Sequence, residues 1–385
     1  MTLSIGLICH PGFGGSVRIA IELADGLGRR GHQVYLFARA KPMGIDSFGP
    51  GVRFVSLNGH RPVPAADRLD AEWSPRDLRG LVRRIVPVAD AAPLDVLHFH
   101  YAVPFGRVTD EVGRRLGARR PGLVGTLHGT DVSVYGSQRR TRAALARRLA
   151  SLDAVTTVSR AYQALSANVF RLTDPPVVIP NFVDLGRFRP LRRDAPPRPR
   201  LVHVSNFRRV KEPAMVARVF ARVRRQMDAE LWLVGDGETM PSVRRVLRSA
   251  GIQEDVREFG FRRDVETIVR EADVLLVTSR SESFCLAALE AAACGVPAVA
   301  GRVGGLPEVV ADGETGLLYD PGDEGAAARA VLRLLVDPAK RTALGNAARA
   351  RAMRFSAETI VPRYEELYER VANRRAADPF VGAVG

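Results

Sequence analysis

The chain has 385 residues, more than the roughly 100–200 that one domain usually holds, so we predict two domains. Hydrophobic residues make up 46% of it, which fits a packed core, and no apolar run reaches the roughly 18 residues of a membrane span. Three cysteines are too few for a disulfide framework, so we expect free thiols. The first residues lack the pattern of a signal peptide, and we expect a cytoplasmic protein.

The formal net charge of +15 comes largely from arginines dispersed along the chain. A solvated basic surface is the favoured interpretation, and no nucleic-acid partner is expected, because no module combines aromatic and basic residues as single-strand binders do. Basic clusters at residues 138–142 and 147–148 leave contact with a membrane surface as the less favoured alternative.

Apolar runs alternate with helical patterns through the first half of the chain. Strands are predicted at residues 4–9, 33–37, 95–100, 123–127, 154–159 and 177–180, and a helix at 17–29. Residues 40–76 are rich in Gly and Pro and are predicted to be irregular. This alternation is typical of a parallel sheet covered by helices.

A glycine-bearing loop, Gly14-Gly15-Ser16, joins the first strand to the first helix. Glycine lets a ligand approach the backbone closely, so the loop is a candidate anion cradle. A tight turn that requires a positive φ explains the glycines equally well.

Polar residues follow two other strands. His98 and His100 alternate along one strand and share a face, but a third metal ligand is missing nearby, so hydrogen-bonding roles are favoured over a metal site. His128 and Thr130 follow the strand at 123–127. The carboxyl end of a parallel strand is where such sheets bind ligands, so a site role is favoured for this pair.

Composition changes at residues 187–200, which are rich in Pro and Arg. We predict a first domain at 1–188, a connector at 189–200, a second domain at 201–355, a C-terminal helix at 356–375 that begins after Ser356, and a tail at 376–385. Strands of the second domain are predicted at 201–204, 231–234, 256–259, 274–278 and 298–300. The predicted fold is α/β, with two doubly wound Rossmann-like domains facing across a cleft and the last helix returning to the first domain.

Cations and glycines follow the strands of the second domain. Arg208 and Lys211 follow its first strand, Gly235 and Gly237 follow another, and Gly304-Gly305 follow a third. Alone, each has a simple explanation as a solvated charge or a turn former. Together, at one edge of a sheet, they predict a site for a diphosphate-containing ligand.

Two carboxylates flank the strand-to-helix junction in residues 279–295. Glu282 precedes the predicted helix, and Glu290 is expected about two turns inside it. Backbone N–H groups at a helix start favour negative charge, and the carboxylates could bind sugar hydroxyls.

Glu282-Ser283-Phe284 through Glu290 resembles the donor signature of the retaining glycosyltransferases of family four. Residues 303–308 and 312–316 resemble the segment that follows it. The resemblance to the family covers nearly the whole chain. Residues 14–16, 100–104, 126–131 and 205–211 resemble a subgroup with a small dicarboxylate acceptor. Asn206, where most relatives carry Arg, also resembles that subgroup.

The resemblance implies a two-domain GT-B fold and transfer of N-acetylglucosamine from UDP-N-acetylglucosamine to L-malate, the first step of bacillithiol synthesis. It implies catalytic roles for Lys211, Glu282 and His128, and no metal or cofactor. The implied donor-binding residues are Gly15, Arg208, Lys211, Glu282, Ser283, Phe284, Cys285, Leu286 and Glu290. The implied acceptor-binding residues are Ser16, Tyr101, Thr130 and Asn206.

Three alternatives stay open at this point. The acceptor could be an inositol phosphate or a lipid, the reaction could be that of a UDP-sugar 2-epimerase, or the chain could be an inactive sugar-nucleotide-binding module. A homodimer is also left open.

Cys285 departs from the family pattern, in which Gly usually follows the Phe of the signature. Its side chain is expected to crowd the donor sugar. A thiol at a helix start can also have a lowered pKa, which makes a redox switch a less favoured alternative.

Overall fold

The computed structural model describes residues 1–12, 14–42, 47–57, 73–191 and 196–377. It divides the chain into two compact units, one formed by Met1–Pro180 together with the C-terminal helix, the other by Asn181–Ser356. Parts of the predicted irregular stretch at 40–76, the middle of the predicted connector and most of the predicted tail lie outside the described residues.

The first unit is a parallel sheet covered by helices, as predicted. Its strands lie in the order β3-β2-β1-β4-β5-β6-β7, and all of the pairings are parallel. The strands are β1 (Ser4–Ile8), β2 (Gln33–Ala38), β3 (Val52–Ser56), β4 (Val96–His100), β5 (Gly122–Leu127), β6 (Ala154–Thr157) and β7 (Val177–Val178). The helices are α1 (Gly15–Arg29), α2 (Pro75–Ala91), α3 (Ala102–Leu116), α4 (Arg139–Ala150), α5 (Arg160–Phe170) and α13 (Ala357–Ala376), with a π-helical turn at Asp131–Tyr135.

One strand was missed in the first unit. β3 lies inside the stretch predicted to be irregular, and it pairs only with β2 among the described residues. An edge strand buries fewer side chains than a central one, and none of the β3 residues is fully buried. Its apolar signal is therefore weak. The helix after the gap, α2, begins behind Ser74, whose hydroxyl accepts the Asp77 N–H while the Asp77 carboxylate accepts the Ser74 N–H.

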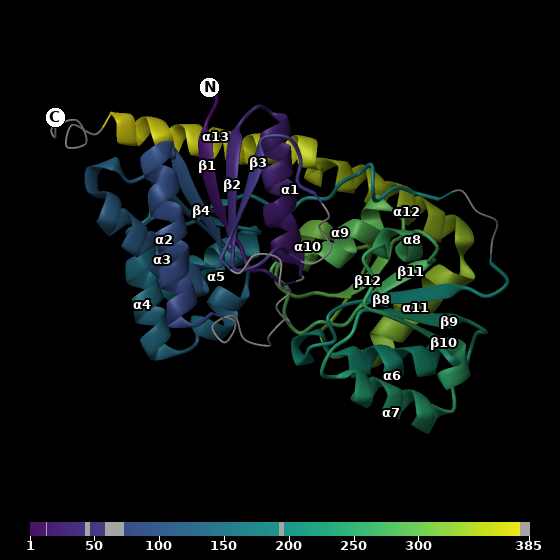
Figure 1. The fold of residues 1–385 in the computed structure, drawn as a ribbon. Helices are drawn as coiled ribbons and strands as arrows, with labels where there is room; N and C mark the ends of the chain where they lie inside the picture. The colour runs from purple at the N-terminus through teal and green to yellow at the C-terminus, as the bar shows by residue number, and fades with distance from the viewer. Residues whose placement is uncertain (13, 43–46, 58–72, 192–195, 378–385) are drawn as a thin grey trace. The chain divides into compact units, whose positions relative to one another are not determined.

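The last helix belongs to the first unit, as predicted. Figure 1 shows α13, in yellow, running across the strands of that unit, and it packs against α1, β4 and β5. Its Tyr364 and Tyr368 are completely buried. In the described parts of the chain, no helix is both long and apolar enough to cross a membrane.

The second unit repeats the architecture with strand order β10-β9-β8-β11-β12-β13, again parallel throughout. Its strands are β8 (Arg200–Val204), β9 (Glu230–Val234), β10 (Val256–Gly260), β11 (Val274–Val277), β12 (Ala298–Gly301) and β13 (Gly316–Tyr319). Its helices are α6 (Pro213–Arg224), α7 (Met240–Ala250), α8 (Val265–Val269), α9 (Leu286–Ala293), α10 (Leu306–Val309), α11 (Glu324–Val336) and α12 (Pro338–Ala352). The sequence prediction missed β13, which has four residues.

The boundary between the units differs from the predicted one at residue 188. The second unit begins at Asn181 because the residues after it pack within that unit. The Val183 N–H donates to the Phe355 carbonyl at 2.9 Å, and Phe188 is completely buried. Arg349 also donates to the Phe188 carbonyl at 2.9 Å. That the two units face each other across a cleft stays a prediction.

Candidate active site

Lys211 lies in a sharply bent loop after β8. Phe207 and Glu212, at the two ends of the bend, have φ angles of 43° and 47°, a region that side-chain-bearing residues rarely adopt. Two glycines after β9 make room for this loop. A Cβ at Gly235 would lie 1.8 Å from the Ser205 carbonyl oxygen, and one at Gly237 would lie 2.1 Å from that of Asn206. These glycines therefore do more than form a turn, because they let the two loops meet backbone to backbone.

The Lys211 ammonium and the Glu282 carboxylate form the central ion pair of the second unit. Nζ lies 2.6 Å from Oε1, and the Ser279 hydroxyl donates to the same oxygen at 2.7 Å. The Glu282 side chain is 8% exposed and that of Lys211 is 26% exposed. The pair thus keeps a cation accessible beside a buried, hydrogen-bonded carboxylate.

The segment after Glu282 leads into α9, which begins at Leu286. Glu290 is therefore the fifth helical residue, about one turn inside the helix rather than two, because residues 282–285 are not helical. Its side chain is buried. Phe284 is also buried and meets the Phe355 ring edge-on at 5.6 Å. Ser283 and Leu286 are half-buried.

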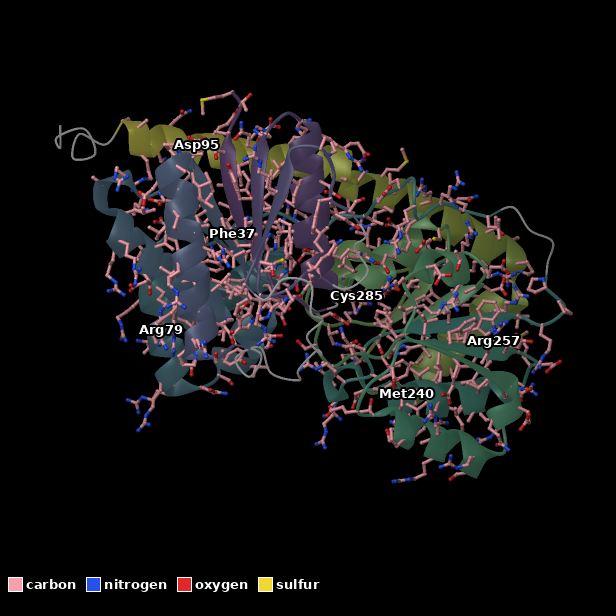
Figure 2. The ribbon with its side chains drawn as sticks, in the orientation of Figure 1. Phe37, Arg79, Asp95, Met240, Arg257 and Cys285 are labelled. Atoms are coloured by element: carbon pink, nitrogen blue, oxygen red, sulfur yellow. The ribbon has the colours of Figure 1, made fainter. Side chains whose placement is uncertain are left out.

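Cys285, labelled in Figure 2, precedes α9 with a φ of 80°, where glycine is favoured. Its side chain is buried, and burial raises the pKa of its thiol to about 12. The lowered pKa on which the less favoured redox alternative depends is not found, because the loss of hydration outweighs the effect of the helix start. A buried neutral thiol does not suit a redox switch.

His203, on β8, supports the Lys211 loop through hydrogen bonds. Its Nδ1 donates to the Leu276 carbonyl on β11 at 2.9 Å, so its Nε2 accepts from the Ser205 hydroxyl at 2.8 Å. The Ser205 oxygen in turn accepts the Phe207 N–H at 3.1 Å. Burial lowers the pKa of His203 to about 4, and the nearby Lys211 charge acts in the same direction.

His128 follows β5 in the first unit and is buried. Its Nε2 lies 2.9 Å from Nδ1 of His100, at the end of β4. The Asp131 carboxylate accepts the backbone N–H groups of His128 and Val103 at 3.2 and 3.1 Å. Burial raises the pKa of Asp131 to about 7, and these hydrogen bonds oppose the shift. His100, His128 and Asp131, with Tyr101 beside them, form what we call the first-unit cluster.

A buried chain of hydrogen bonds behind this cluster reaches the C-terminal helix. His98 lies 2.7 Å from the Tyr368 hydroxyl and 2.7 Å from the Thr126 hydroxyl, which itself lies 2.6 Å from that of Thr156. Burial lowers the pKa of His98 to about 3 and those of His100 and His128 well below their usual value. The predicted hydrogen-bonding role of His98 and His100 is confirmed.

The predicted acceptor residues are divided between the units. Tyr101 has a φ of 80°, and its ring centre lies 5.1 Å from that of His128. Thr130 follows two residues after His128, and Ser16 lies in the first turn of α1, whose first residue is Gly15. Asn206, which is exposed, belongs to the Lys211 loop of the second unit. The predicted donor residue Arg208 is half-buried in the same loop.

Gly14 does not support the tight-turn explanation of the first loop. Its φ of 165° is extended, and no atom of the described residues other than its chain neighbours lies within 4 Å of where its Cβ would be. Neither the backbone conformation nor crowding among the described residues requires a glycine here.

Besides His203, sequence reasoning missed four residues that hold the candidate side chains in place, namely Thr278, Ser279, His100 as the partner of His128, and Asp131. All stand at or just after the carboxyl end of a strand. Their position after a strand could have marked them as site residues. Their partners could not be predicted, because strand pairing determines which residues meet.

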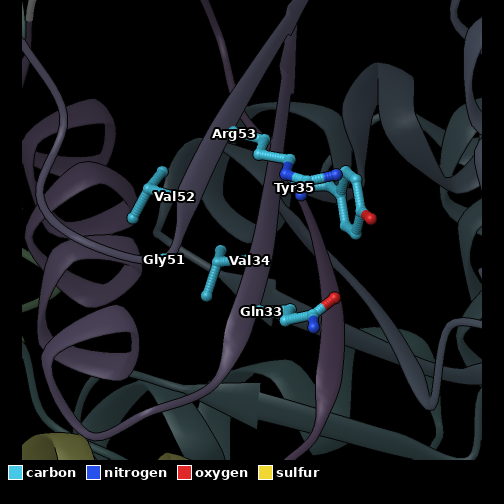
Figure 3. A pocket seen from close by; sticks show the side chains of 6 residues that line it. All are labelled: Gln33, Val34, Tyr35, Gly51, Val52 and Arg53. Carbon is cyan, nitrogen blue, oxygen red and sulfur yellow. The ribbon is translucent and has the colours of Figure 1, made fainter.

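Two cavities among the described residues are lined by side chains other than those of Lys211 and Glu282. One, of about 360 Å³, is lined by the first residues of β2 and β3 and by Gly51, at the opposite edge of the sheet from His128. Figure 3 shows Tyr35 and Arg53 on one side of these strands and Val34 and Val52 on the other. A hollow of about 300 Å³ lies beside the Lys211 loop and is lined partly by Arg209, Glu212 and Arg280. Across the residues that the structure describes, no group of three or more His, Cys, Asp or Glu side chains could hold a metal ion.

Sequence comparisons agree with this architecture. Residues 13–187 match the model described as Glycosyltransferase Family 4, and residues 191–351 match Glycosyl transferases group 1. An N-acetyl-alpha-D-glucosaminyl L-malate synthase of Bacillus anthracis is 32% identical, with 96% of this chain and 97% of the relative covered. A D-inositol 3-phosphate glycosyltransferase of Xylanimonas cellulosilytica is 28% identical, with 94% and 93% covered.

Solved structures show the same fold. The sucrose-phosphate synthase of Thermosynechococcus elongatus has a TM-score of 0.81 at 24% identity, with 97% of this chain and 100% of that one covered. HepE of Anabaena, solved with UDP-glucose, has a TM-score of 0.78 at 19% identity, with 96% and 100% covered. With two parallel Rossmann-like units and this likeness along nearly its full length, the chain belongs to the glycosyltransferases of family 4, and it is a transferase enzyme.

Proposed function

We propose that this enzyme transfers N-acetylglucosamine from UDP-N-acetylglucosamine to the hydroxyl group of L-malate, with retention at the sugar carbon. The choice of substrates rests on one observation. The chain is 32% identical, along nearly the whole of both chains, to an enzyme named for that reaction. The residues of the subgroup, Asn206 in particular, support the same choice.

The ion pair supplies the chemistry. In the transfer, the bond between the anomeric carbon and the phosphate oxygen breaks, and its electron pair leaves with UDP. The accessible Lys211 ammonium, fixed on Glu282, would stabilise the growing charge on that oxygen, usually the largest catalytic contribution. We assign Arg208 and the Gly15 backbone to the same diphosphate.

The remaining predicted residues take the two substrates. Glu290 would accept ribose hydroxyls, and Glu282 with the N–H groups of Phe284, Cys285 and Leu286 would hold the transferred sugar. His128 would contact that sugar, and Ser16, Tyr101, Thr130 and Asn206 would bind the dicarboxylate. The acceptor hydroxyl attacks from the face that UDP leaves and passes its proton to the departing phosphate. Metal independence, a cytoplasmic location and a homodimer stay predictions.

A single assay tests the proposal. Purified enzyme is incubated with UDP-N-acetylglucosamine alone, with L-malate, and with D-inositol 3-phosphate, and UDP release and product mass are followed. Release that depends on malate, with the mass of the malate glycoside, is the expected result. Release that depends only on the inositol phosphate would establish the second candidate, favoured by the 28% identical relative. Conversion of the sugar without an acceptor would mean an epimerase. The same reactions with EDTA test metal independence.

A further inference from the structure

Two loops of the second unit are joined by several hydrogen bonds and two ion pairs. One is the bent Lys211 loop after β8, and the other is the segment Thr278–Glu282 after β11, the strand that pairs with β8. The Arg280 N–H donates to the Val210 carbonyl at 2.9 Å, and the Arg280 guanidinium also pairs with the Glu212 carboxylate. The Lys211–Glu282 ion pair is thus one of several links between these loops.

The Thr278 hydroxyl occupies the centre of this junction. Its Oγ1 lies 2.9 Å from the carbonyl oxygen of Lys211 and 3.1 Å from that of Glu212, and it donates its hydrogen to them. Thr278 is 3% exposed, so water does not replace this bond easily. The hydroxyl therefore holds the backbone of Lys211, the residue whose ammonium forms the ion pair.

The Thr278 hydroxyl bonds to the loop at a residue with a strained backbone conformation. Glu212 has a φ of 47° and directly precedes α6, so the chain leaves Lys211 through a conformation that a non-glycine residue adopts only when its surroundings enforce it. One residue further along the other loop, the Ser279 hydroxyl donates to the Glu282 oxygen that Lys211 also contacts. The hydroxyls of two adjacent residues therefore fix both sides of the ion pair. Thr278 bonds to the Lys211 backbone, and Ser279 bonds to the Glu282 carboxylate.

We infer that Thr278 is a positioning residue for the transfer reaction: it fixes the backbone of the Lys211 loop so that the ammonium stays at the diphosphate position. This inference rests on the proposed function, because it acts through Lys211. The Thr278 hydroxyl donates to the backbone carbonyls of Lys211 and Glu212, and this role needs no contact with either substrate.

A double-mutant cycle tests the inference. Thr278→Val keeps the shape and removes the hydroxyl, and we expect kcat/KM for the donor to fall roughly tenfold, the size of one lost hydrogen bond that positions a charged group. Thr278→Ser restores the hydroxyl and should stay within about threefold of wild type. In a Lys211→Ala background, Thr278→Val should have almost no further effect, because the group that it positions is gone.

The UDP affinity repeats the cycle without relying on residual turnover, and calorimetry measures it for wild type, Thr278→Val, Lys211→Ala and the double variant. Thr109→Val is a matched control, since Thr109 is a completely buried threonine of the first unit whose hydroxyl donates to the Gly106 carbonyl at 3.2 Å. It reports the cost of removing such a hydroxyl elsewhere. Melting temperatures show whether each variant folds.

The outcomes separate this inference from the proposed function. Equal losses from Thr278→Val with and without Lys211 would overturn the inference, since they would mean a structural effect alone. Wild-type activity in Thr278→Val would overturn it as well. If Lys211→Ala itself kept full activity and UDP affinity, the role assigned to Lys211 under the proposed function would fail instead.

Discussion

The two units place polar groups at the same edge of similar sheets, but they do so in opposite electrostatic states. The first-unit cluster consists of histidines that burial keeps neutral and a carboxyl group whose pKa burial raises. The second unit instead keeps full charges and satisfies them with an ion pair and a hydroxyl. A neutral cluster suits hydroxyl groups, which need hydrogen bonds, whereas a paired cation suits a diphosphate, which needs charge.

The largest expected effect comes from removing the charge. Lys211→Ala should lower kcat by roughly 10²–10³-fold, because a fixed donor to the leaving group is lost. Arg209→Ala is the matched control, since its side chain is 90% exposed in the same loop, and it should stay near wild type. Turnover is measured as UDP release. Equal losses in both variants would mean that general positive charge, rather than the fixed ammonium, is what matters.

Removing the neutral group should cost less. His128→Asn is expected to lower kcat/KM roughly 10- to 30-fold, the value of one or two neutral hydrogen bonds. His32→Asn serves as the control, because His32 bonds to Leu3 and Glu365 within the same unit. A loss as large as that of Lys211→Ala would remove the contrast between the two clusters.

Acid should destabilise the first unit more steeply than the second. Between about pH 6 and 4.5 the unfolded chain protonates His98, His100 and His128, while the folded unit keeps them neutral. Asp131 works in the other direction, because its raised pKa makes the folded state hold a proton that the unfolded state releases. Two protons remain in excess on the unfolded side, so stability falls by about 3 kcal/mol per pH unit on acidification.

The second unit has one such group, His203, whose pKa is lowered to about 4, so its stability should fall by about 1.4 kcal/mol per pH unit in the same window. The two tryptophans report the units separately, with Trp73 in the first and Trp232 in the second. Urea unfolding of Trp232→Phe and Trp73→Phe, followed by fluorescence at several pH values, gives the two slopes. Identical slopes would contradict the assignment of neutral histidines to the first unit.

The smallest effect concerns Cys285. Glycine normally destabilises a protein relative to alanine, but at a φ of 80° the order should reverse, so Cys285→Gly should be about 1 kcal/mol more stable than Cys285→Ala. Chemical denaturation measures the difference. Peroxide should inactivate wild type and Cys285→Gly equally, because the buried thiol has a pKa of about 12. Selective inactivation of wild type would restore the redox switch.

The sequence was sufficient for the units and for most of their strands, because parallel strands are buried on both faces and read as apolar runs. It missed β3, a half-exposed edge strand, and β13, whose four residues are too few for a pattern. It placed Lys211 and Glu282 at one edge of a sheet because each follows the carboxyl end of a predicted parallel strand. It could not show the hydrogen bond between Thr278 and the Lys211 backbone, or the one between His100 and His128. The first depends on the pairing of β11 with β8, and the second on the pairing of β4 with β5.

The return of α13 to the first unit sets the order in which the chain can fold during synthesis. His98 bonds to Tyr368, 270 residues later, so the face of the first sheet that α13 covers waits until all of Asn181–Ser356 has been made. The second unit is complete before the first. A ribosome-bound chain that ends before α13 should therefore protect Trp232 from solvent while His98, the partner of Tyr368, remains accessible.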